Sequence, residues 1–126
     1  MKDNDEISEI YSEKKDIEKF VNILKKFSYD ELIKDKHYFF SLTEKNTSED
    51  FMREIYPQFE RIGLVLHRTR KKGADNYDFL YEMDDGTYVT YAITVSNDPP
   101  VLKNGFPVDR NFNNFKKHLL KFFKRY

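Results

Sequence analysis

A histidine followed by a run of cationic side chains is the strongest chemical signal in this sequence. His67 comes near the end of an alternating apolar segment that predicts a strand, and Arg68, Arg70, Lys71 and Lys72 follow it. A metal-independent RNase needs a base for the 2′-hydroxyl group and cations for the charge that develops on the phosphate. One hypothesis is therefore catalysis by His67, Arg68 and Arg70, with the four cationic residues as a nucleic-acid-binding stretch.

The pleat of a strand works against that hypothesis. Successive side chains point to opposite faces, so His67 cannot share one cluster with Arg68 and Arg70. The other histidines, His37 and His118, are distant in sequence, and His118 falls on the apolar flank of a predicted helix, where we expect it to be packed. A solvated, positively charged strand end is the favoured interpretation.

Metal-dependent and cofactor-dependent chemistry finds little support. The chain has no cysteine, and its three histidines lack the spacing of metal ligands. Asp84 and Asp85 precede Gly86 in a predicted turn, where aspartate is favoured for backbone reasons. Four scattered glycines make no phosphate-binding loop. We expect no metal site, no cofactor and, in the preferred hypothesis, no catalytic residue.

Charge is divided unevenly along a chain that is neutral overall. Residues 1–60 carry 15 acidic and 10 basic side chains, whereas residues 61–126 carry 7 and 12. Overall neutrality argues against a simple polyanion binder, which gains its affinity by neutralising phosphates. Either the two halves attract each other within the fold, or a basic face on the second half meets an acidic partner or nucleic acid.

For a partner protein that handles nucleic acid, the expected contact is the acidic N-terminal stretch, because acidic surfaces steer toward basic clefts. This stretch comprises Asp3, Asp5, Glu6, Glu9, Glu13, Asp16 and Glu18.

The length of 126 residues suits one domain, residues 1–126, and 12 Phe with 9 Tyr can supply its core. The first dozen residues are polar and acidic, so we expect residues 1–12 to be mobile. No apolar run is long enough for a membrane span, and the N-terminus does not resemble a signal peptide. We expect a cytoplasmic protein without membrane contact; its oligomeric state is left open.

Helical periodicity marks the N-terminal half and the C-terminal end. It predicts a helix over residues 13–27, a short helix over residues 29–34, and a helix capped by Thr47 or Ser48 that Pro57 interrupts. Asp109 is expected to cap a last helix, with an apolar stripe packed on the sheet and lysines facing solvent. The stripe is Phe112, Phe115, Leu119 and Phe122, and the lysines are Lys117, Lys121 and Lys124.

Alternating apolar residues then predict strands over residues 64–70, 77–83 and 87–95, joined as an antiparallel meander. Residues 37–43 are ambiguous between a strand and a buried turn, and we favour a strand. The Pro- and Gly-containing residues 97–108 predict an ordered loop or a small hairpin.

The turn between the last two predicted strands sets their register. A two-residue turn at Asp85-Gly86 places Tyr81 opposite Thr90. It also leaves an apolar face that something must cover, from within the chain or from a partner. This face comprises Leu80, Val89, Tyr91 and Ile93.

Residues 73–95 (GADNYDFLYEMDDGTYVTYAITV) resemble the core of the PD-(D/E)xK nucleases. That family places an aspartate on one strand and an acid-x-lysine motif on the next, to hold a metal ion and position water. Asp78 matches the aspartate, but Ala92 and Thr94 stand where the acid and the lysine are expected. The resemblance therefore implies an inactive domain that lacks a metal ligand and a partner for the water.

A second resemblance covers residues 85–123. The turn with glycine, the tyrosine-rich segment after it, "NDPPVLKNG" and "DRNFNNFKKHLLKFF" resemble the end of the SUKH-superfamily immunity proteins. These proteins share a strand, a proline-containing loop and a terminal Phe-rich helix, and the resemblance implies neutralisation of a toxin, often a nuclease. The family's N-terminal pattern, Leu-Pro followed by a Tyr-rich helix and Asn-Gly, does not occur in residues 13–62.

The sequence thus favours a single α+β domain with N-terminal helices, a three-stranded antiparallel meander, a fourth strand considered over residues 37–43, and a C-terminal amphipathic helix. The preferred function is non-enzymatic binding of another protein, of the immunity or inhibitor type. The alternatives are a nucleic-acid-binding protein or metal-independent RNase of the toxin type, and an inactive PD-(D/E)xK-like domain.

Overall fold

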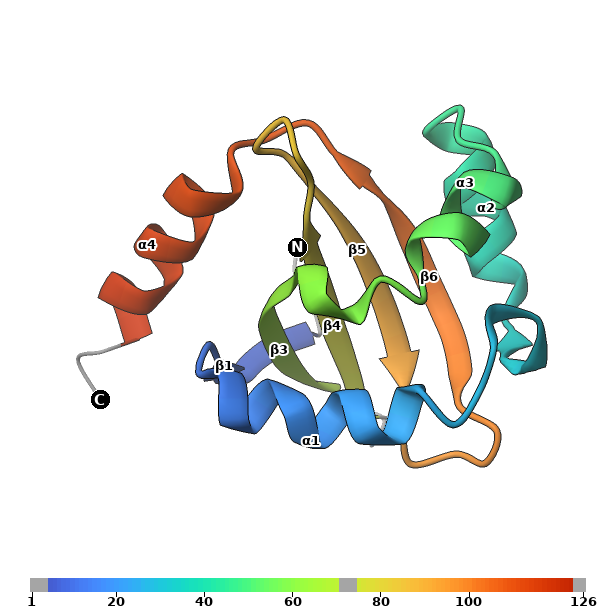
Figure 1. The fold of residues 1–126 in the computed structure, drawn as a ribbon, viewed down its shortest axis with the longest axis horizontal. Helices are drawn as coiled ribbons and strands as arrows, with labels where there is room; N and C mark the ends of the chain where they lie inside the picture. Colours follow the sequence, from blue (N-terminus) through green and yellow to red (C-terminus); the bar gives the residue numbers. More distant parts are fainter. Residues whose placement is uncertain (1–4, 71–74, 124–126) are drawn as a thin grey trace.

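A mixed six-stranded sheet organises the chain, and the computed structural model describes residues 5–70 and 75–123 of it (Figure 1). The spatial order of the strands is β1-β3-β4-β5-β6-β2, in which only the β2–β6 pair is parallel. The strands are β1 (Asp5–Tyr11), β2 (Ile33–Lys34), β3 (Ile62–Arg70), β4 (Asp75–Glu82), β5 (Tyr88–Thr94) and β6 (Val101–Val108). The helices are α1 (Lys14–Leu24), α2 (Lys36–Glu44), α3 (Glu49–Ile55) and α4 (Phe112–Phe123), with short 3-10 turns η1 (Tyr29–Glu31) and η2 (Phe59–Arg61).

The prediction of a three-stranded meander is wrong, although the α+β class is correct. β3, β4 and β5 match the predicted strands, but the meander continues into β6 and the sheet also includes β1 and β2. β6 was expected to be a loop or hairpin because of Asn104-Gly105. The glycine is needed there for close packing instead, since a Cβ on Gly105 would lie 3.1 Å from both Met52 Cε and Tyr38 Cε1.

Part of the N-terminal segment that the sequence led us to expect as mobile, residues 1–12, forms regular secondary structure. Asp5–Tyr11 forms β1, an edge strand that pairs antiparallel with β3. Its Tyr11 ring packs edge-on against Phe20 of α1 at 5.2 Å between ring centroids. Charged residues on such a strand are expected, because they discourage pairing with a foreign strand edge.

The expected strand over residues 37–43 is instead helix α2. Asp35 caps this helix, because the backbone N–H of His37 donates to Asp35 Oδ1 at 2.9 Å. Tyr38 and Leu42, one turn apart, are buried, and Ser41 donates to the carbonyl of Gly105 on β6. Phe39, on the opposite side, is exposed. A helix with apolar residues on both sides lacks the one-sided pattern by which helices are recognised.

The other helical predictions hold for α1 and for Ser48, whose Oγ accepts from the backbone N–H of Phe51. The predicted short helix over residues 29–34 divides into η1 and β2. At the C-terminal end, Asp109 is not the cap; Asn111 Oδ1 accepts from the N–H of Asn114.

Helices α1, α2 and α3 pack on one face of the sheet and form the larger core with the side chains of that face. Buried tyrosine hydroxyls tie this helical layer down, since Tyr81 donates to the carbonyl of Tyr56 and Tyr91 to that of Met52, both at 2.7 Å. The sheet contributes Val65, Phe79, Tyr81, Val89, Tyr91 and Ile93 to this core.

Helix α4 packs on the opposite face and forms a smaller core with Leu64, Leu66, Leu80 and Tyr88. Phe112 and Leu119 are buried as predicted and Phe115 is partly buried, whereas Phe122 is exposed. The expected packing of His118 is wrong, because this residue is exposed. Gly63 allows the close approach of α4, since a Cβ there would lie 2.8 Å from Phe112 Cζ. Lys117 and Lys121 are exposed, and Lys124 lies outside the described residues.

The β4–β5 turn has three residues rather than two. Met83 N–H donates to the carbonyl of Thr87, and Gly86 adopts a φ of 90° inside the loop. Tyr81 therefore pairs with Val89 and not with Thr90. A shift of one residue exchanges the two faces of a strand, so the predicted mixed apolar face does not exist. Val89, Tyr91 and Ile93 are buried under α1–α3, and Leu80 is buried under α4.

Candidate functional site

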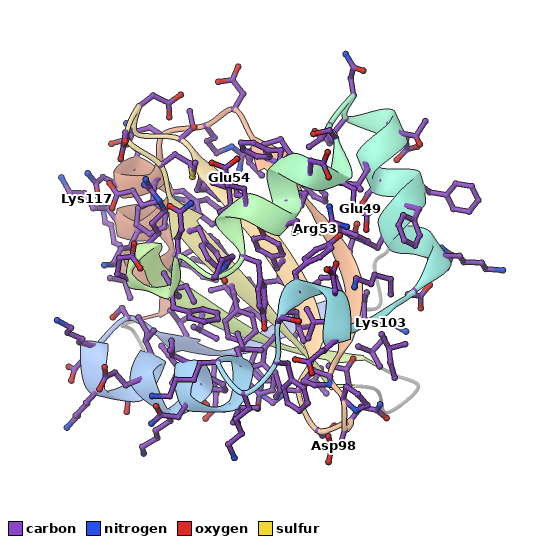
Figure 2. All side chains as sticks on the ribbon, turned by 45° about the vertical axis from the view of Figure 1, so that its right-hand side comes forward. Glu49, Arg53, Glu54, Asp98, Lys103 and Lys117 are labelled. Atoms are coloured by element: carbon purple, nitrogen blue, oxygen red, sulfur yellow. The ribbon has the colours of Figure 1, made fainter. Side chains whose placement is uncertain are left out.

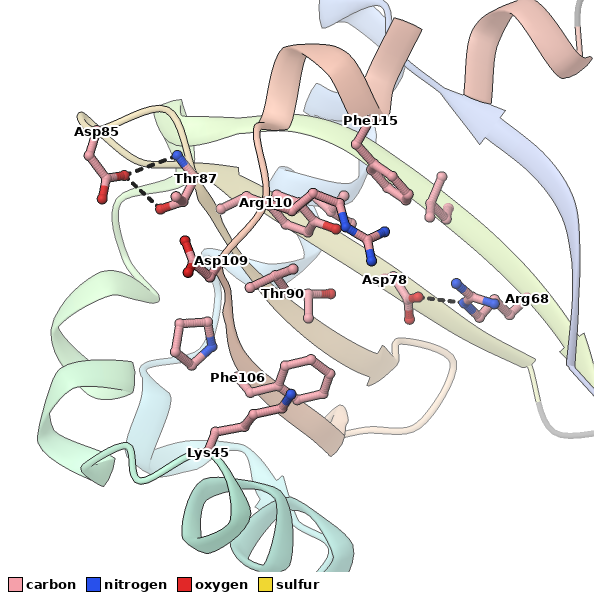
Figure 3. A pocket seen from close by; sticks show the side chains of 15 residues that line it. Lys45, Arg68, Asp78, Asp85, Thr87, Thr90, Phe106, Asp109, Arg110 and Phe115 are labelled. Atoms are coloured by element: carbon pink, nitrogen blue, oxygen red, sulfur yellow. Dashed lines mark hydrogen bonds and ion pairs between the residues drawn. The ribbon is translucent and has the colours of Figure 1, made fainter. Parts of the chain in front are cut away.

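The sheet face that carries α4 is only partly covered by that helix, and the rest is hollowed into a groove of about 760 Å³ (Figure 3). β3, β4, β5 and β6 form its floor, α4 one wall, and the end of α2 the other. The floor changes from apolar residues near α4, such as Leu66 and Leu80, to polar residues farther along the strands, such as Arg68 and Asp78.

An ion pair between Arg68 and Asp78 lies in this floor. Arg68 Nε is 2.5 Å from Asp78 Oδ2, and the side chains are 29% and 14% exposed. The register between β3 and β4 explains the pair. Asp78 stands opposite Leu66 on β3, and Arg68 follows two residues after Leu66 on the same face of that strand. Next to them, buried Asn76 accepts a hydrogen bond from the hydroxyl of Thr94 at 2.7 Å. Polar side chains so enclosed are normally held by such bonds.

A second hollow of about 460 Å³ shares Arg68 and Asp78 with the groove and extends it toward the start of α2. Asp35 and Lys103 face each other there, with Lys103 Nζ 3.0 Å from Asp35 Oδ2. This contact and the bond from His37 N–H lower the pKa of Asp35 below its ordinary value of 3.8, the backbone bond being the larger cause. The groove therefore crosses the sheet from α4 to α2.

Aromatic rings with cations above them line the walls of the groove. Lys45 Nζ lies 5.1 Å from the ring centre of Phe106, and the guanidinium carbon of Arg110 lies 5.7 Å from that of Phe115. The Phe115 ring also stacks on Tyr88 at 5.5 Å. Burial raises the pKa of Tyr88, and the charges of Arg110 and Arg68 oppose that rise.

His67 lies on the other face of the sheet, as the alternation of side chains predicts. Its ring stacks on Tyr77 at 4.5 Å, and its Nδ1 lies 3.4 Å from Glu9 Oε1 and 3.3 Å from Ser8 Oγ. Arg68 instead pairs with Asp78 in the groove. The structure therefore separates His67 from Arg68. The side chain of Arg70 and all of Lys71 and Lys72 lie outside the described part of the chain.

The acidic residues predicted to meet a partner lie on β1 and at the start of α1. Asp3 lies outside the described residues, as do the side chains of Asp5 and Glu6. Of the rest, Glu9, Glu13 and Glu18 are exposed and Asp16 is partly exposed. Glu9 also accepts a hydrogen bond from Tyr11, at 2.5 Å.

The acidic excess of the first half is not confined to this stretch. Residues 1–18 carry seven acidic and three basic side chains, and residues 28–60 carry eight and four. The segment that contains α2 and α3 therefore carries an acidic excess of its own.

Three carboxylates meet one guanidinium on the surface of α3. Arg53 lies 2.6 Å from Asp50, 3.0 Å from Asp30 and 3.7 Å from Glu49. Figure 2 shows Glu49, Arg53 and Glu54 along this helix. The Glu49, Asp50 and Arg53 spacing is visible in the sequence as neighbours on one helix face. The contact between Arg53 and Asp30 of η1, in contrast, depends on the tertiary fold.

Two phenylalanines of α2 are also exposed, Phe39 by 43% and Phe40 by 63%. Tyr38 connects the two regions: its ring lies 5.4 Å from that of Phe39, and its hydroxyl is 2.6 Å from that of Tyr29. Tyr29 in turn donates to Glu49 at 3.1 Å. The sequence interpretation missed this surface because it placed both phenylalanines in a strand.

The nuclease-like strands place Asp78 directly opposite Ala92. The position expected to hold a second acid therefore carries a methyl group, and Asp78 faces a guanidinium instead. Over residues 5–70 and 75–123, no group of three or more His, Asp or Glu residues is arranged to hold a metal ion.

Comparison with protein families, with curated proteins and with solved structures finds no match for this chain. Among the described helices, none combines the length and the apolar character that crossing a membrane requires.

Proposed function

We propose that this protein is a non-enzymatic binding module of the inhibitor or immunity type. In this proposal it docks a basic protein surface through the outer side of α2 and the adjoining acidic side of α3. We call this region the α2–α3 surface, and define it by Phe39, Phe40, Asp30, Glu49 and Asp50.

The observation that carries the proposal is the pair of exposed phenylalanines on α2. The inward side of this helix is already packed, with Tyr38 and Leu42 buried. Phe39 packs partly on the Tyr38 ring, and Phe40 is the more exposed of the two. Exposed aromatic residues are enriched in the buried centres of protein interfaces.

Charge supports a basic partner. Three carboxylates surround Arg53, and Lys34 lies over the same Tyr29 ring as Arg53, so this part of the α2–α3 surface keeps an excess of one negative charge. Such an excess accelerates encounter with a positive surface and disfavours nucleic acid. A nucleic-acid-binding cleft of a toxin is one surface with the required charge.

The test is binding of a partner captured from the organism that produces the protein, repeated with the purified partner. Phe40→Ser should weaken the affinity by about tenfold or more, which corresponds to about 1.4 kcal/mol or more. Phe122→Ser is the matched control, because Phe122 is equally an exposed phenylalanine but lies on α4. The association rate should also fall steeply with added salt.

Equal affinity of the wild type and Phe40→Ser would contradict the proposal, as would a loss of the same size in Phe122→Ser. Binding of labelled RNA that survives Phe40→Ser would support the nucleic-acid-binding alternative instead.

A further inference from the structure

We propose that the groove on the α4 face is a second binding site, which takes a small organic anion. Its carboxylate or phosphate group would bind at the end formed by Arg68, Arg110 and Tyr88, and its flat apolar body would lie against Phe106 and Phe115. This site is on the opposite face of the sheet from the core under α1–α3, and it does not depend on the proposed protein-binding function.

The first argument is the supply of hydrogen-bond donors at this end of the groove. Arg68 uses its Nε on Asp78, and within residues 5–70 and 75–123 its two terminal nitrogens make no other hydrogen bond, so they can donate to another acceptor. The hydroxyl of Tyr88 makes no hydrogen bond to any residue that the structure describes, and the Tyr88 side chain lines the groove. A guanidinium fork and a phenol suit an oxyanion, because both donate and an oxyanion only accepts.

The second argument is the way in which the charges are separated along the groove. Asp85 and Asp109 lie at the end next to the β4–β5 turn, whereas Arg68, Asp78 and the guanidinium of Arg110 lie toward the other end (Figure 3). Asp85 is also engaged by its own turn, since it accepts from the N–H of Thr87 at 3.0 Å and from its hydroxyl at 2.6 Å.

The positive end therefore holds two guanidinium groups and one carboxylate. Arg110 rests on the ring of Phe115 rather than on a carboxylate. An added oxyanion would give this second guanidinium a partner of opposite charge.

The third argument is shape and lining. The groove measures about 760 Å³, within the range of about 300–1,000 Å³ that is typical of small-molecule sites. Next to the positive end, Leu66, Leu80, Phe106 and Phe115 provide an apolar surface with two aromatic rings. A ligand with one anionic end and one flat apolar end matches this division.

A nucleic-acid strand fits less well, because the groove and its extension also carry Asp35, Asp85 and Asp109. A strand with a phosphate at every nucleotide would have to pass these carboxylates. A small molecule with a single anionic group avoids them.

The test is titration calorimetry of the full chain with three probes: adenosine monophosphate, 2-naphthoate and inorganic phosphate. We expect saturable binding of at least one of the two aromatic anions, and weaker or no binding of phosphate alone. Adenosine monophosphate binding without naphthoate binding would identify a phosphate ligand, and the reverse would identify a carboxylate ligand.

Two variants locate the binding without disturbing the partly buried ion pair of Arg68 and Asp78. Arg110→Ala removes an exposed guanidinium and should weaken the affinity by about tenfold, and Tyr88→Phe removes only a hydroxyl and should weaken it by a smaller factor. Lys117→Ala, an exposed cation on the outer side of α4, is the matched control and should bind as the wild type does. The proposal is overturned if neither aromatic anion binds at millimolar concentration, or if binding is unchanged in both Arg110→Ala and Tyr88→Phe.

Discussion

Tyrosine hydroxyls that bond to backbone carbonyls fix the helical layer to the sheet at single points. Tyr81 reaches from β4 to the carbonyl of Tyr56, and Tyr91 reaches from β5 to that of Met52. Tyr56, in turn, donates to the carbonyl of Leu24 at the end of α1. Carbonyls at a helix end lack partners within the helix, and these hydroxyls supply donors to them. The carbonyls of Met52 and Leu24 also accept from the backbone N–H groups of Tyr56 and Phe27.

Tyr81→Phe should destabilise the protein more than Tyr91→Phe. Among the described residues the carbonyl of Tyr56 accepts from Tyr81 alone, whereas that of Met52 also accepts from the N–H of Tyr56. We expect a loss of about 1–3 kcal/mol in the free energy of unfolding for Tyr81→Phe and less for Tyr91→Phe, measured by urea denaturation. Equal losses would show that the free carbonyl of Tyr56 finds another donor.

For single residues, the sequence predicted the strand face that a side chain occupies better than it predicted the residue that the side chain contacts. It placed His67 and Arg68 on opposite faces, because alternation along a strand is a local property. It could not show that Arg68 meets Asp78, since that contact depends on the register between β3 and β4. It also missed Phe39 and Phe40 as surface residues, because exposure of an apolar side chain follows from the fold and not from its type.

Helix α2 begins at an aspartate that serves two elements at once. Asp35 accepts from the N–H of His37 as the N-cap and pairs with Lys103 on β6. Both contacts favour the carboxylate form, and its pKa is therefore lower in the folded protein than its ordinary value of 3.8. The unfolded chain then takes up this proton first as the pH falls. The stability contributed by Asp35 is present above that value and is lost on acidification through the folded pKa.

Asp35→Asn should make the free energy of unfolding less sensitive to pH on the acid side of 3.8. Asparagine also caps helices, so the loss at neutral pH should be modest, at about 1 kcal/mol or less. Urea denaturation between neutral pH and pH 3 provides the measurement. Lys103→Met, which keeps the cap but removes the pair, should flatten the profile less. An unchanged acid limb in Asp35→Asn would show that other carboxylates account for the acid sensitivity.

Elements with one-sided or alternating patterns were predicted well, and those shaped by their neighbours were not. The helix α1 and the strands β3, β4 and β5 carry the expected periodicities. β2 has two residues and exists because Ile33 pairs with Val101 of β6, a contact between distant parts of the chain. The β4–β5 turn includes Asp84 as a third loop residue. The pairing of β4 with β5 is therefore shifted by one residue from the prediction, and each side chain of β5 lies on the face opposite to the predicted one relative to β4.

The whole molecule keeps its candidate chemical groups on different faces of the sheet. His67 stacks on Tyr77 and lies beside Glu9, whereas Arg68 and Asp78 lie in the groove under α4. A nuclease needs its base, cations or metal ligands within reach of one phosphate. Neither face, as far as the structure describes it, combines these groups.

We therefore expect no nuclease activity. The assay incubates the purified protein with labelled RNA and with single- and double-stranded DNA, with and without Mg²⁺ or Mn²⁺. Cleavage that is lost in His67→Ala would support the metal-independent RNase hypothesis. Metal-dependent cleavage that is lost in Asp78→Asn would show that the resemblance to the PD-(D/E)xK core extends to activity.

The packing of α2 on β6 affects the order in which the chain can fold during synthesis. α2 leaves the ribosome before β3, β4 and β5, and the strand that it packs against leaves only after them. Until β6 arrives, Tyr38 has no Gly105 beneath it, and both sides of the helix expose aromatic rings to solvent or to a chaperone. Completion of the helical layer is therefore a late, long-range event, and the nascent chain ending at β5 is the species most prone to aggregate.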